Sequence, residues 1–451
     1  MAVVAAAVLL VAATTAWAAP PSDTISTTDI QAMLDGGGSV TGYFDTVLGG
    51  ATLADQAPTP VPVTIKAIVP GANPTGSGGD LILFEASGTD IATIGGIAHG
   101  MSGSPLYVDD GGTFKLAGAV SYGDIFTTHN LGLATPIADM IAIETNYMST
   151  AGLSAARVAT TAKLAAPVKT SAGTIGSVVV APSSAAARSL SRTAAGPVMA
   201  PLTTVQISGL DHRSKLYQKL AASLEARGVD VSPFSAGSRL GAAPPAPDEP
   251  GAPLGAMYST GDVTIGAFGT VTYVDPDNDV LVAFGHPFDW LGPDSLILTS
   301  AWVQGIWSTT YDPYWVASPG LTVGEITQDR AAGIAGTLGV DTAHPALVGV
   351  DSQATMGTLK RNDTSKVSSW IVQNPLFGGL PSAVAGAVMM KAADAFMLPG
   401  SATTSATIHV TDGVSDYTIQ RDNVWSDPFD VTSFATGDID SALSALVPAP
   451  A

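Results

Sequence analysis

A serine between glycines is the first residue of this chain that is suited to covalent chemistry. Ser102 lies in the stretch Gly95–Pro105, GGIAHGMSGSP, which leads into an apolar segment. Glycines on both sides allow a tight turn that exposes a hydroxyl and aims successive backbone N–H groups at one point. We therefore predict Ser102 as a nucleophile, with the amides of Gly100 and Ser102 as the oxyanion hole. Ser104 is the competing hydroxyl, and a turn that only reverses a strand is the alternative.

The residues after Ser102 are expected to form a strand, a turn and a second strand. Leu106–Val108 and Phe114–Gly123 are apolar and strand-like, and Asp109–Gly112 between them is typical of a turn. The serine therefore opens a β-hairpin.

This arrangement resembles the second barrel of chymotrypsin-like serine peptidases. The motif GxSGxP is followed at a similar distance by an apolar strand that ends in Ser121-Tyr122-Gly123. In the resembled peptidases that strand pairs with the backbone of the substrate. The resemblance implies a substrate-binding role for Ser121, Tyr122 and Gly123.

A longer pattern is similar to one particular bacterial family. GGIxxGMSGSP, with GAVSYG at 118–123 and GLATPI at 132–137, resembles the SpoIVB family, the sporulation stage-IV B serine peptidases. GTVTYVDP at 269–276 and AFGHP at 283–287 resemble the histidine-bearing half of that family. The resemblance implies that His286 is the general base, where the alternative is a histidine that only caps a G-H-P turn.

The sequence departs from the family in two ways. The family places its histidine half first, whereas Ser102 here precedes His286. A site between two barrels depends on position in space, so the exchanged order is compatible with catalysis. Second, Ser87 occupies the position of the family's aspartate. Asp90 and Asp289 are the available substitutes, and a Ser–His dyad is the alternative.

The remaining histidines offer no metal site. None of them shows the spacing H-x-H or H-E-x-x-H that typical zinc ligands have. We predict neither a metal nor another cofactor. These histidines are His99, His129, His212, His344 and His409.

Composition favours a strand-rich protein that does not bind nucleic acid. Lys and Arg number 18 against 38 Asp and Glu, a net charge of −20, and nucleic-acid binding needs a basic footprint. The 49 glycines and 31 prolines favour many short strands, and the absence of cysteine excludes disulfides and a thiol nucleophile. The expected fold is mainly β, with two chymotrypsin-like barrel halves in permuted order and a small α/β linker unit.

The predicted domain boundaries follow from the segments in which strand-like sequence patterns are concentrated. Residues 382–398 and 438–446 are expected to be helical, and 407–420 to form a hairpin. The predicted units are a signal peptide at 1–18, a serine-bearing β half at 39–148, a linker with a small strand-helix unit at 149–253, a histidine-bearing β half at 254–420 and a tail at 421–451.

The first 18 residues are almost wholly apolar and end in Ala16-Trp17-Ala18, which is typical of a signal-peptidase site. A signal peptide usually begins with a basic residue, whereas the first one here is Lys66, so a membrane anchor is the alternative. The run is short for a bilayer span, which favours the signal peptide. We expect a secreted or cell-envelope protein with no integral membrane span once the signal is removed.

Two classes of function fit these observations. The first is an exported serine endopeptidase of SpoIVB type that acts on a protein or peptide. The second is a non-catalytic binding or scaffold protein of the cell envelope that retains the peptidase fold. The sequence makes no prediction of the oligomeric state.

Overall fold

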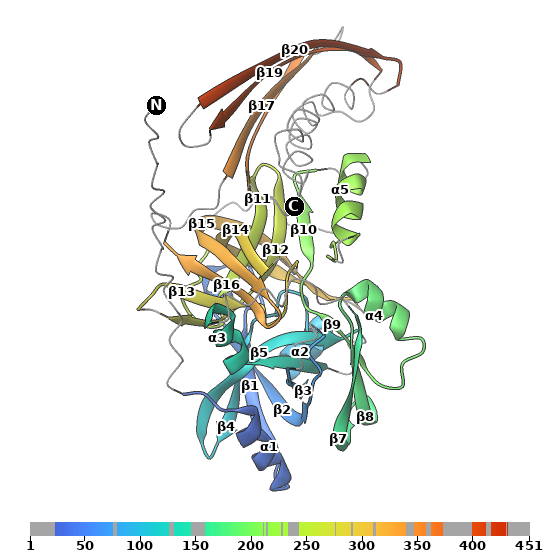
Figure 1. The fold of residues 1–451 in the computed structure, drawn as a ribbon, viewed down its shortest axis with the longest axis vertical. Coiled ribbons are helices and arrows are strands. Elements are labelled where there is room, and N and C mark those ends of the chain that lie inside the picture. Colours follow the sequence, from blue (N-terminus) through green and yellow to red (C-terminus); the bar gives the residue numbers. More distant parts are fainter. Residues whose placement is uncertain are drawn as a thin grey trace, which may run out of the picture.

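The chain is built mainly from β-strands, which form two nine-stranded sheets and one two-stranded sheet (Figure 1). This confirms the predicted mainly β fold class with two barrel halves. The structure is a computed structural model. It describes residues 23–74, 79–125, 130–145, 158–210, 212, 215–226, 229–232, 243–275, 277–289, 292–309, 313–339, 347–357, 362–372, 399–411, 416–429 and 431.

Six antiparallel strands of the first sheet close into a ring, which we call the serine barrel. Alternating apolar residues such as Val61, Val63 and Ile65 are buried, because successive side chains of a strand point to opposite faces. The ring closes because, counted in chain order, the fourth strand pairs with both the first and the fifth. In ring order the strands are β1 (Val40–Thr46), β2 (Thr59–Val69), β3 (Leu81–Ala86), β6 (Leu131–Pro136), β5 (Thr113–Asp124) and β4 (Pro105–Asp110).

Short helices lie at the ends of these strands. The side chain of Ser26 caps the first of them by accepting a hydrogen bond from the amide of Asp29. The last of them follows the last barrel strand directly, and its residues Met140 and Ile143 pack into a small core cluster. The helices are α1 (Thr27–Asp35), the 3-10 turn η1 (Leu53–Gln56), α2 (Thr89–Ile94) and α3 (Ile137–Thr145).

Six antiparallel strands of the second sheet form a second ring, which we call the histidine barrel. In chain order, the first strand of this barrel pairs with both the second and the fourth, and these pairings close the ring. Figure 1 shows this barrel next to the serine barrel. In ring order the strands are β11 (Pro253–Gly261), β12 (Thr264–Asp275), β13 (Val280–Ala283), β16 (Gly333–Leu338), β15 (Tyr314–Arg330) and β14 (Gly292–Trp307).

The region expected to be a linker instead extends both sheets. Val178 and Val180 are buried in the core, although the surrounding Ala, Ser and Thr give the sequence little periodic contrast. The expected strand and helix after residue 203 are present. The elements are β7 (Thr160–Thr170), β8 (Gly173–Val180), α4 (Ser184–Leu190) and β9 (Val198–Pro201) on the serine side, then β10 (Val205–Ser208) on the histidine side and α5 (Lys215–Glu225).

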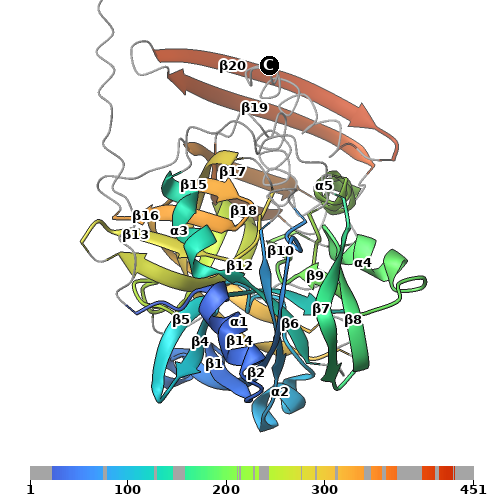
Figure 2. The same cartoon turned by 60° about the horizontal axis from the view of Figure 1, so that its bottom comes forward.

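The last described strands lie outside the histidine barrel. β17 (Leu347–Gly357) and β18 (Asn362–Val372) form a hairpin that pairs with β11. β19 (Gly400–Thr411) and β20 (Asp416–Asp427) form a separate hairpin that contains the one expected at 407–420, at the end of the molecule away from the serine barrel (Figures 1 and 2). The signal peptide expected at 1–18 and the helices expected at 382–398 and 438–446 lie outside the described residues.

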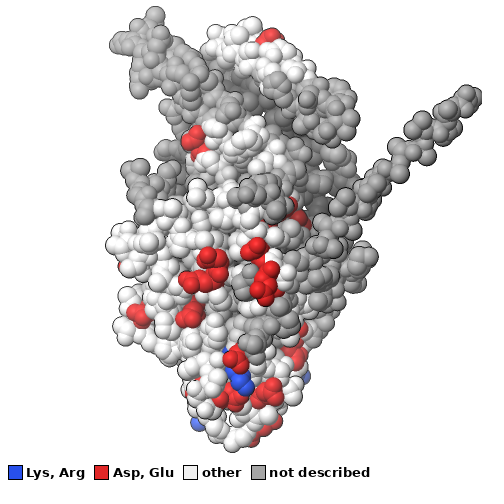
Figure 3. All heavy atoms as spheres, turned by 90° about the vertical axis from the view of Figure 1, so that its left-hand side faces the viewer, with Lys and Arg blue, Asp and Glu red and all other residues white. Residues whose placement is uncertain are grey.

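Acidic side chains dominate the charged surface on the face shown in Figure 3. Two ion pairs are seen among the described residues, Lys66 with Glu85 and Lys115 with Asp110. Within the described part of the chain, no helix has the length and apolar character needed to cross a membrane.

The two barrels meet at the loop of residues 95–104, which we call the serine loop. On one side, His99 exchanges backbone hydrogen bonds with the segment around Tyr314: its N–H donates to Pro313 and its carbonyl accepts from Trp315. On the other side, Ser102 accepts a 2.8 Å hydrogen bond from the amide of Thr270 in β12. The serine loop is therefore bonded to the histidine barrel on both sides.

Gly103 allows the closest approach of the two barrels. Its φ is +93°, and a Cβ at this position would lie 1.8 Å from the carbonyl oxygen of Thr270. Gly111, in the turn between β4 and β5, also has a positive φ, +65°, but a Cβ there would meet nothing within 4 Å. Comparing substitutions at Gly103 and Gly111 therefore distinguishes the cost of a positive φ from the cost of the close contact between the barrels.

We expect Gly103→Ala to lower the free energy of unfolding by at least about 3 kcal/mol, because it adds a backbone collision to the strain of a positive φ. Gly111→Ala is the matched control and should cost only about 1 kcal/mol. Denaturant unfolding of both variants measures the difference. Equal losses would mean that the close approach at Gly103 contributes nothing.

Candidate active site

Ser102 lies in a sharp turn between α2 and β4, as the glycine pattern predicts. Gly100 and Gly103 on either side of it have φ angles of +101° and +93°. A Cβ at Gly100 would lie 2.5 Å from the ring of Trp315, so this position also requires glycine for space. Ser102 is fully buried where the two barrels meet.

His286 lies in a turn that follows β13. Phe284 and Gly285 have φ angles of +69° and +70°, which reverse the chain and direct the imidazole toward the serine barrel. Thr135 of β6 donates a hydrogen bond to the carbonyl of Gly285, so the serine barrel also holds this turn. His286 is fully buried, and its ring lies 5.8 Å from the ring of Tyr122.

One hydroxyl joins Ser102 to His286. The Oγ of Ser102 lies 2.7 Å from Oγ1 of Thr203, which lies 3.0 Å from Nε2 of His286. The other ring nitrogen, Nδ1, lies 2.8 Å from the carbonyl oxygen of Pro287. A carbonyl oxygen only accepts hydrogen bonds, so Nδ1 carries the proton and Nε2 accepts. The hydrogen-bond chain therefore runs from Ser102 through Thr203 to His286.

The structure thus brings the two predicted residues into one hydrogen-bonded chain, but not into direct contact. Thr203 was not identified from the sequence, where it only opens the strand-like stretch that becomes β10. Its role depends on where the chain crosses from one sheet to the other. No local motif encodes that crossing, so the sequence carried no signal for Thr203.

The environment of His286 keeps the imidazole neutral. Burial lowers the pKa of His286 from its ordinary value of 6.5 to about 4, although the Pro287 carbonyl and the charge of Asp329 oppose the shift. A neutral imidazole with a free lone pair on Nε2 is the form that can accept a proton.

The low pKa of His286 predicts a loss of stability in acid. Between pH 6.5 and about 4 the unfolded histidine binds a proton and the folded one does not, so stability falls as the pH falls through this window. We expect wild type to lose about 3 kcal/mol more than His286→Gln over this range. Denaturant unfolding at several pH values measures both proteins, and parallel curves would contradict the assignment.

The predicted acids do not contact the imidazole. Asp90 is exposed in the first turn of α2, whereas His286 is fully buried. Asp289 is buried, and its Oδ2 accepts a 2.9 Å hydrogen bond from the hydroxyl of Tyr258. Among the hydrogen bonds of the described residues, Nδ1 of His286 donates to the backbone carbonyl of Pro287 and not to a carboxylate.

A different acid, Asp329 at the end of β15, holds the turn that contains His286. Its two carboxylate oxygens accept hydrogen bonds from the amides of Phe288 and Asp289, at 2.8 Å and 2.7 Å. Its negative charge favours the protonated form of His286. No sequence motif marks Asp329, because its contact depends on how the strands of the histidine barrel pair.

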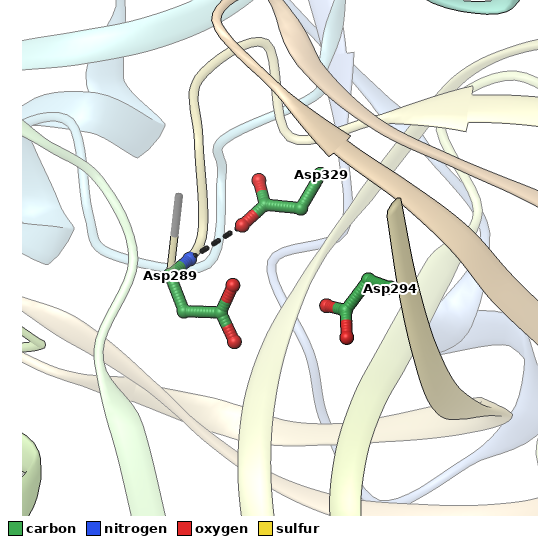
Figure 4. Close-up of side chains that lie close together, drawn as sticks. All are labelled: Asp289, Asp294 and Asp329. Atoms are coloured by element: carbon green, nitrogen blue, oxygen red, sulfur yellow. Dashed lines mark hydrogen bonds between the residues drawn. The ribbon is translucent and has the colours of Figure 1, made fainter. Parts of the chain in front are cut away.

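Three carboxyl groups gather beneath this turn (Figure 4). One oxygen each of Asp289, Asp294 and Asp329 lies within 4.8 Å of the others. Burial and the charges of Asp294 and Asp329 raise the pKa of Asp289 well above its ordinary value. Carboxylates can bind hard cations; here Asp289 accepts a hydrogen bond from Tyr258 and Asp329 accepts two from the backbone amides of the turn.

The raised pKa of Asp289 predicts a loss of stability as the pH rises above about 4, and an amide at this position removes that loss. A raised pKa in the folded state gives stability at low pH that is lost as the pH rises through the folded pKa. We expect Asp289→Asn, which cannot ionise, to become steadily more stable than wild type from about pH 4 upward. Unfolding curves along this pH series test it, and a constant difference between the proteins would refute it.

The predicted oxyanion and substrate-binding residues contact a segment of the same chain. We call Val198–Thr203 the cleft segment. The amide of Gly100 donates a 2.8 Å hydrogen bond to the carbonyl of Leu202. The amide of Leu202 donates a 3.1 Å hydrogen bond to the carbonyl of Ser121. β9 pairs with Tyr122 and Gly123 in β5.

A small cavity of about 20 Å³ remains beside the hydrogen-bonded chain. Thr203 and His286 line it together with Pro201 and Phe288. This volume holds about one water molecule, not a peptide. In this state the cleft segment lies against the residues that the sequence predicts as oxyanion and substrate-binding residues.

The structure contains two closed antiparallel barrels, with Ser102 and His286 at their contact. No family model matches the chain, and no curated protein or solved structure matches it. The geometry of the site and the motifs of the sequence therefore carry the functional argument.

Proposed function

We propose that this protein is a serine endopeptidase of SpoIVB type, with Ser102 as nucleophile and His286 as general base. The observation that carries the proposal is the hydrogen-bonded chain from Ser102 through Thr203 to His286. It joins residues from the two barrels at their contact, and its direction is fixed by the carbonyl behind Nδ1 of His286. A serine hydroxyl is a weak nucleophile without such a base.

The proposed mechanism uses groups that are already in place. Ser102 attacks a peptide carbonyl, and its proton passes to Nε2 of His286; while the cleft segment is in place, the Thr203 hydroxyl bridges the two groups. General base catalysis of this kind contributes roughly 10²- to 10⁴-fold. The amide of Gly100 stabilises the oxyanion, and each such donor contributes roughly 3 kcal/mol. The Pro287 carbonyl orients the imidazole, and the charge of Asp329 favours the imidazolium that forms.

The sequence supports export as the setting of this activity. The apolar first 18 residues end in an A-x-A pattern, and the chain has no cysteine. We therefore propose that the mature protein is secreted or lies in the cell envelope, where its substrate is a protein or peptide.

A non-catalytic binding or scaffold protein is the second candidate, and one observation favours it. Ser102 and His286 are both fully buried, and the amide of Gly100 is bonded to Leu202. A site that never opens would keep the peptidase fold without its chemistry.

Covalent labelling by a fluorophosphonate separates the two candidates. We expect a phosphonyl adduct on Ser102 of the wild-type protein, located by mass spectrometry. Labelling should be absent in Ser102→Ala and slower by at least about 100-fold in His286→Gln, because the base is lost. Ser104→Ala is the matched control, since Ser104 lies in the same buried loop outside the hydrogen-bonded chain, and it should label like wild type. An unlabelled Ser102 would favour the scaffold protein.

A further inference from the structure

The cleft segment lies on the serine barrel in the register of a bound peptide. β9 is antiparallel to β5, with Pro201 opposite Tyr122 and Ala200 opposite Gly123. The amide of Leu202 continues the ladder by donating to the carbonyl of Ser121. An extended peptide that adds to a strand edge binds through backbone hydrogen bonds of this type.

The bond between Leu202 and Thr203 is surrounded by the catalytic groups. The carbonyl oxygen of Leu202 accepts a 2.8 Å hydrogen bond from Gly100, the predicted oxyanion donor. The next residue, Thr203, lies with its hydroxyl 2.7 Å from Oγ of Ser102 and 3.0 Å from Nε2 of His286. One peptide bond therefore has an oxyanion donor on its carbonyl side and the nucleophile and base beside the following residue.

The side chain of Leu202 is accommodated by a glycine. A Cβ at Gly123 would lie 2.7 Å from Cδ2 of Leu202, so a larger residue at this position would displace the leucine. Leu202 is only 3% exposed and belongs to the main hydrophobic core cluster. The space before the susceptible bond is thus apolar and fits an aliphatic side chain.

We infer that the chain is its own first substrate and is cut between Leu202 and Thr203. This inference rests on the proposed peptidase function. Ser102 Oγ bonds to the carbonyl carbon of Leu202 while the bond from that carbon to the nitrogen of Thr203 breaks. The serine proton passes through the Thr203 hydroxyl to His286 and then to the departing nitrogen, which leaves as an amine.

Water completes the reaction. His286 takes a proton from a water molecule, whose oxygen bonds to the ester carbon and releases Leu202 as a carboxylic acid. The same proton returns to Ser102 Oγ. The new terminus at Thr203 is continuous with β10, which belongs to the histidine sheet, whereas β9 stays with the serine sheet. The cut therefore separates the two sides of the cleft segment and frees the site for other peptides with an aliphatic residue before the cut.

The test is the fate of the full-length chain after purification. We expect wild type to separate, under denaturing conditions, into one fragment that ends at Leu202 and one that begins Thr203-Thr204-Val205. Ser102→Ala should stay intact, and it should also stay intact when mixed with wild type, because the reaction is intramolecular. Mass spectrometry and N-terminal sequencing locate the cut.

Matched substitutions test the chemistry of the site. Thr203→Val should slow the cut by about 100-fold, because it removes the hydroxyl that passes the proton. Thr204→Val makes the same change one residue along and should leave the rate within about threefold. Leu202→Asp should slow it by at least about 100-fold, because a carboxylate is excluded from an apolar space, whereas Leu53→Asp at an exposed leucine should not.

The outcomes separate this inference from the proposed function. An intact wild-type chain, a cut at another bond, or cutting of Ser102→Ala by wild type would each overturn the inference. If the intact chain is still labelled by the fluorophosphonate at Ser102, the peptidase function stands without self-cleavage. If the chain is neither cut nor labelled, both proposals fail.

Discussion

The backbone contact between the serine loop and β12 is the constraint on which the site depends. Ser102 and Gly103 are bonded to Thr270 and Thr272 of the histidine barrel through backbone and side-chain hydrogen bonds of 2.8 Å and 2.7 Å. Gly103 has no side chain, so the two backbones can approach this closely. A site made of one residue from each barrel is only as well positioned as this contact.

The sequence predicted the parts of the site that are encoded locally. Ser102 lies in a glycine turn and His286 in a turn after a buried strand, and both features are visible in a few neighbouring residues. Thr203 and Asp329 were missed because they reach the site through strand pairings that involve distant parts of the chain. Strands β7 and β8 lie in the region that the sequence predicted as a linker, for a related reason. Small Ala, Ser and Thr side chains can be buried on a strand without a strong apolar alternation.

The support for His286 shows how a buried site can hold an imidazole without a directly bonded acid. A backbone carbonyl fixes the tautomer, and Asp329 acts one step away by binding the amides of Phe288 and Asp289. Burying a carboxylate against the ring would add a desolvation cost in a place that is already fully enclosed. The carbonyl fixes the same proton on Nδ1 without adding a charge.

The order of the two barrels in the chain also determines which of them is synthesised first. Domains fold in the order in which they are synthesised, from the N-terminus. The strands of the serine barrel and the cleft segment precede the turn of His286 in the chain, so a nascent chain contains Ser102 and the cleft segment before His286 has been synthesised. Under the proposed mechanism, a chain that is still being synthesised therefore lacks its general base until β13 and the turn that follows it have emerged and docked.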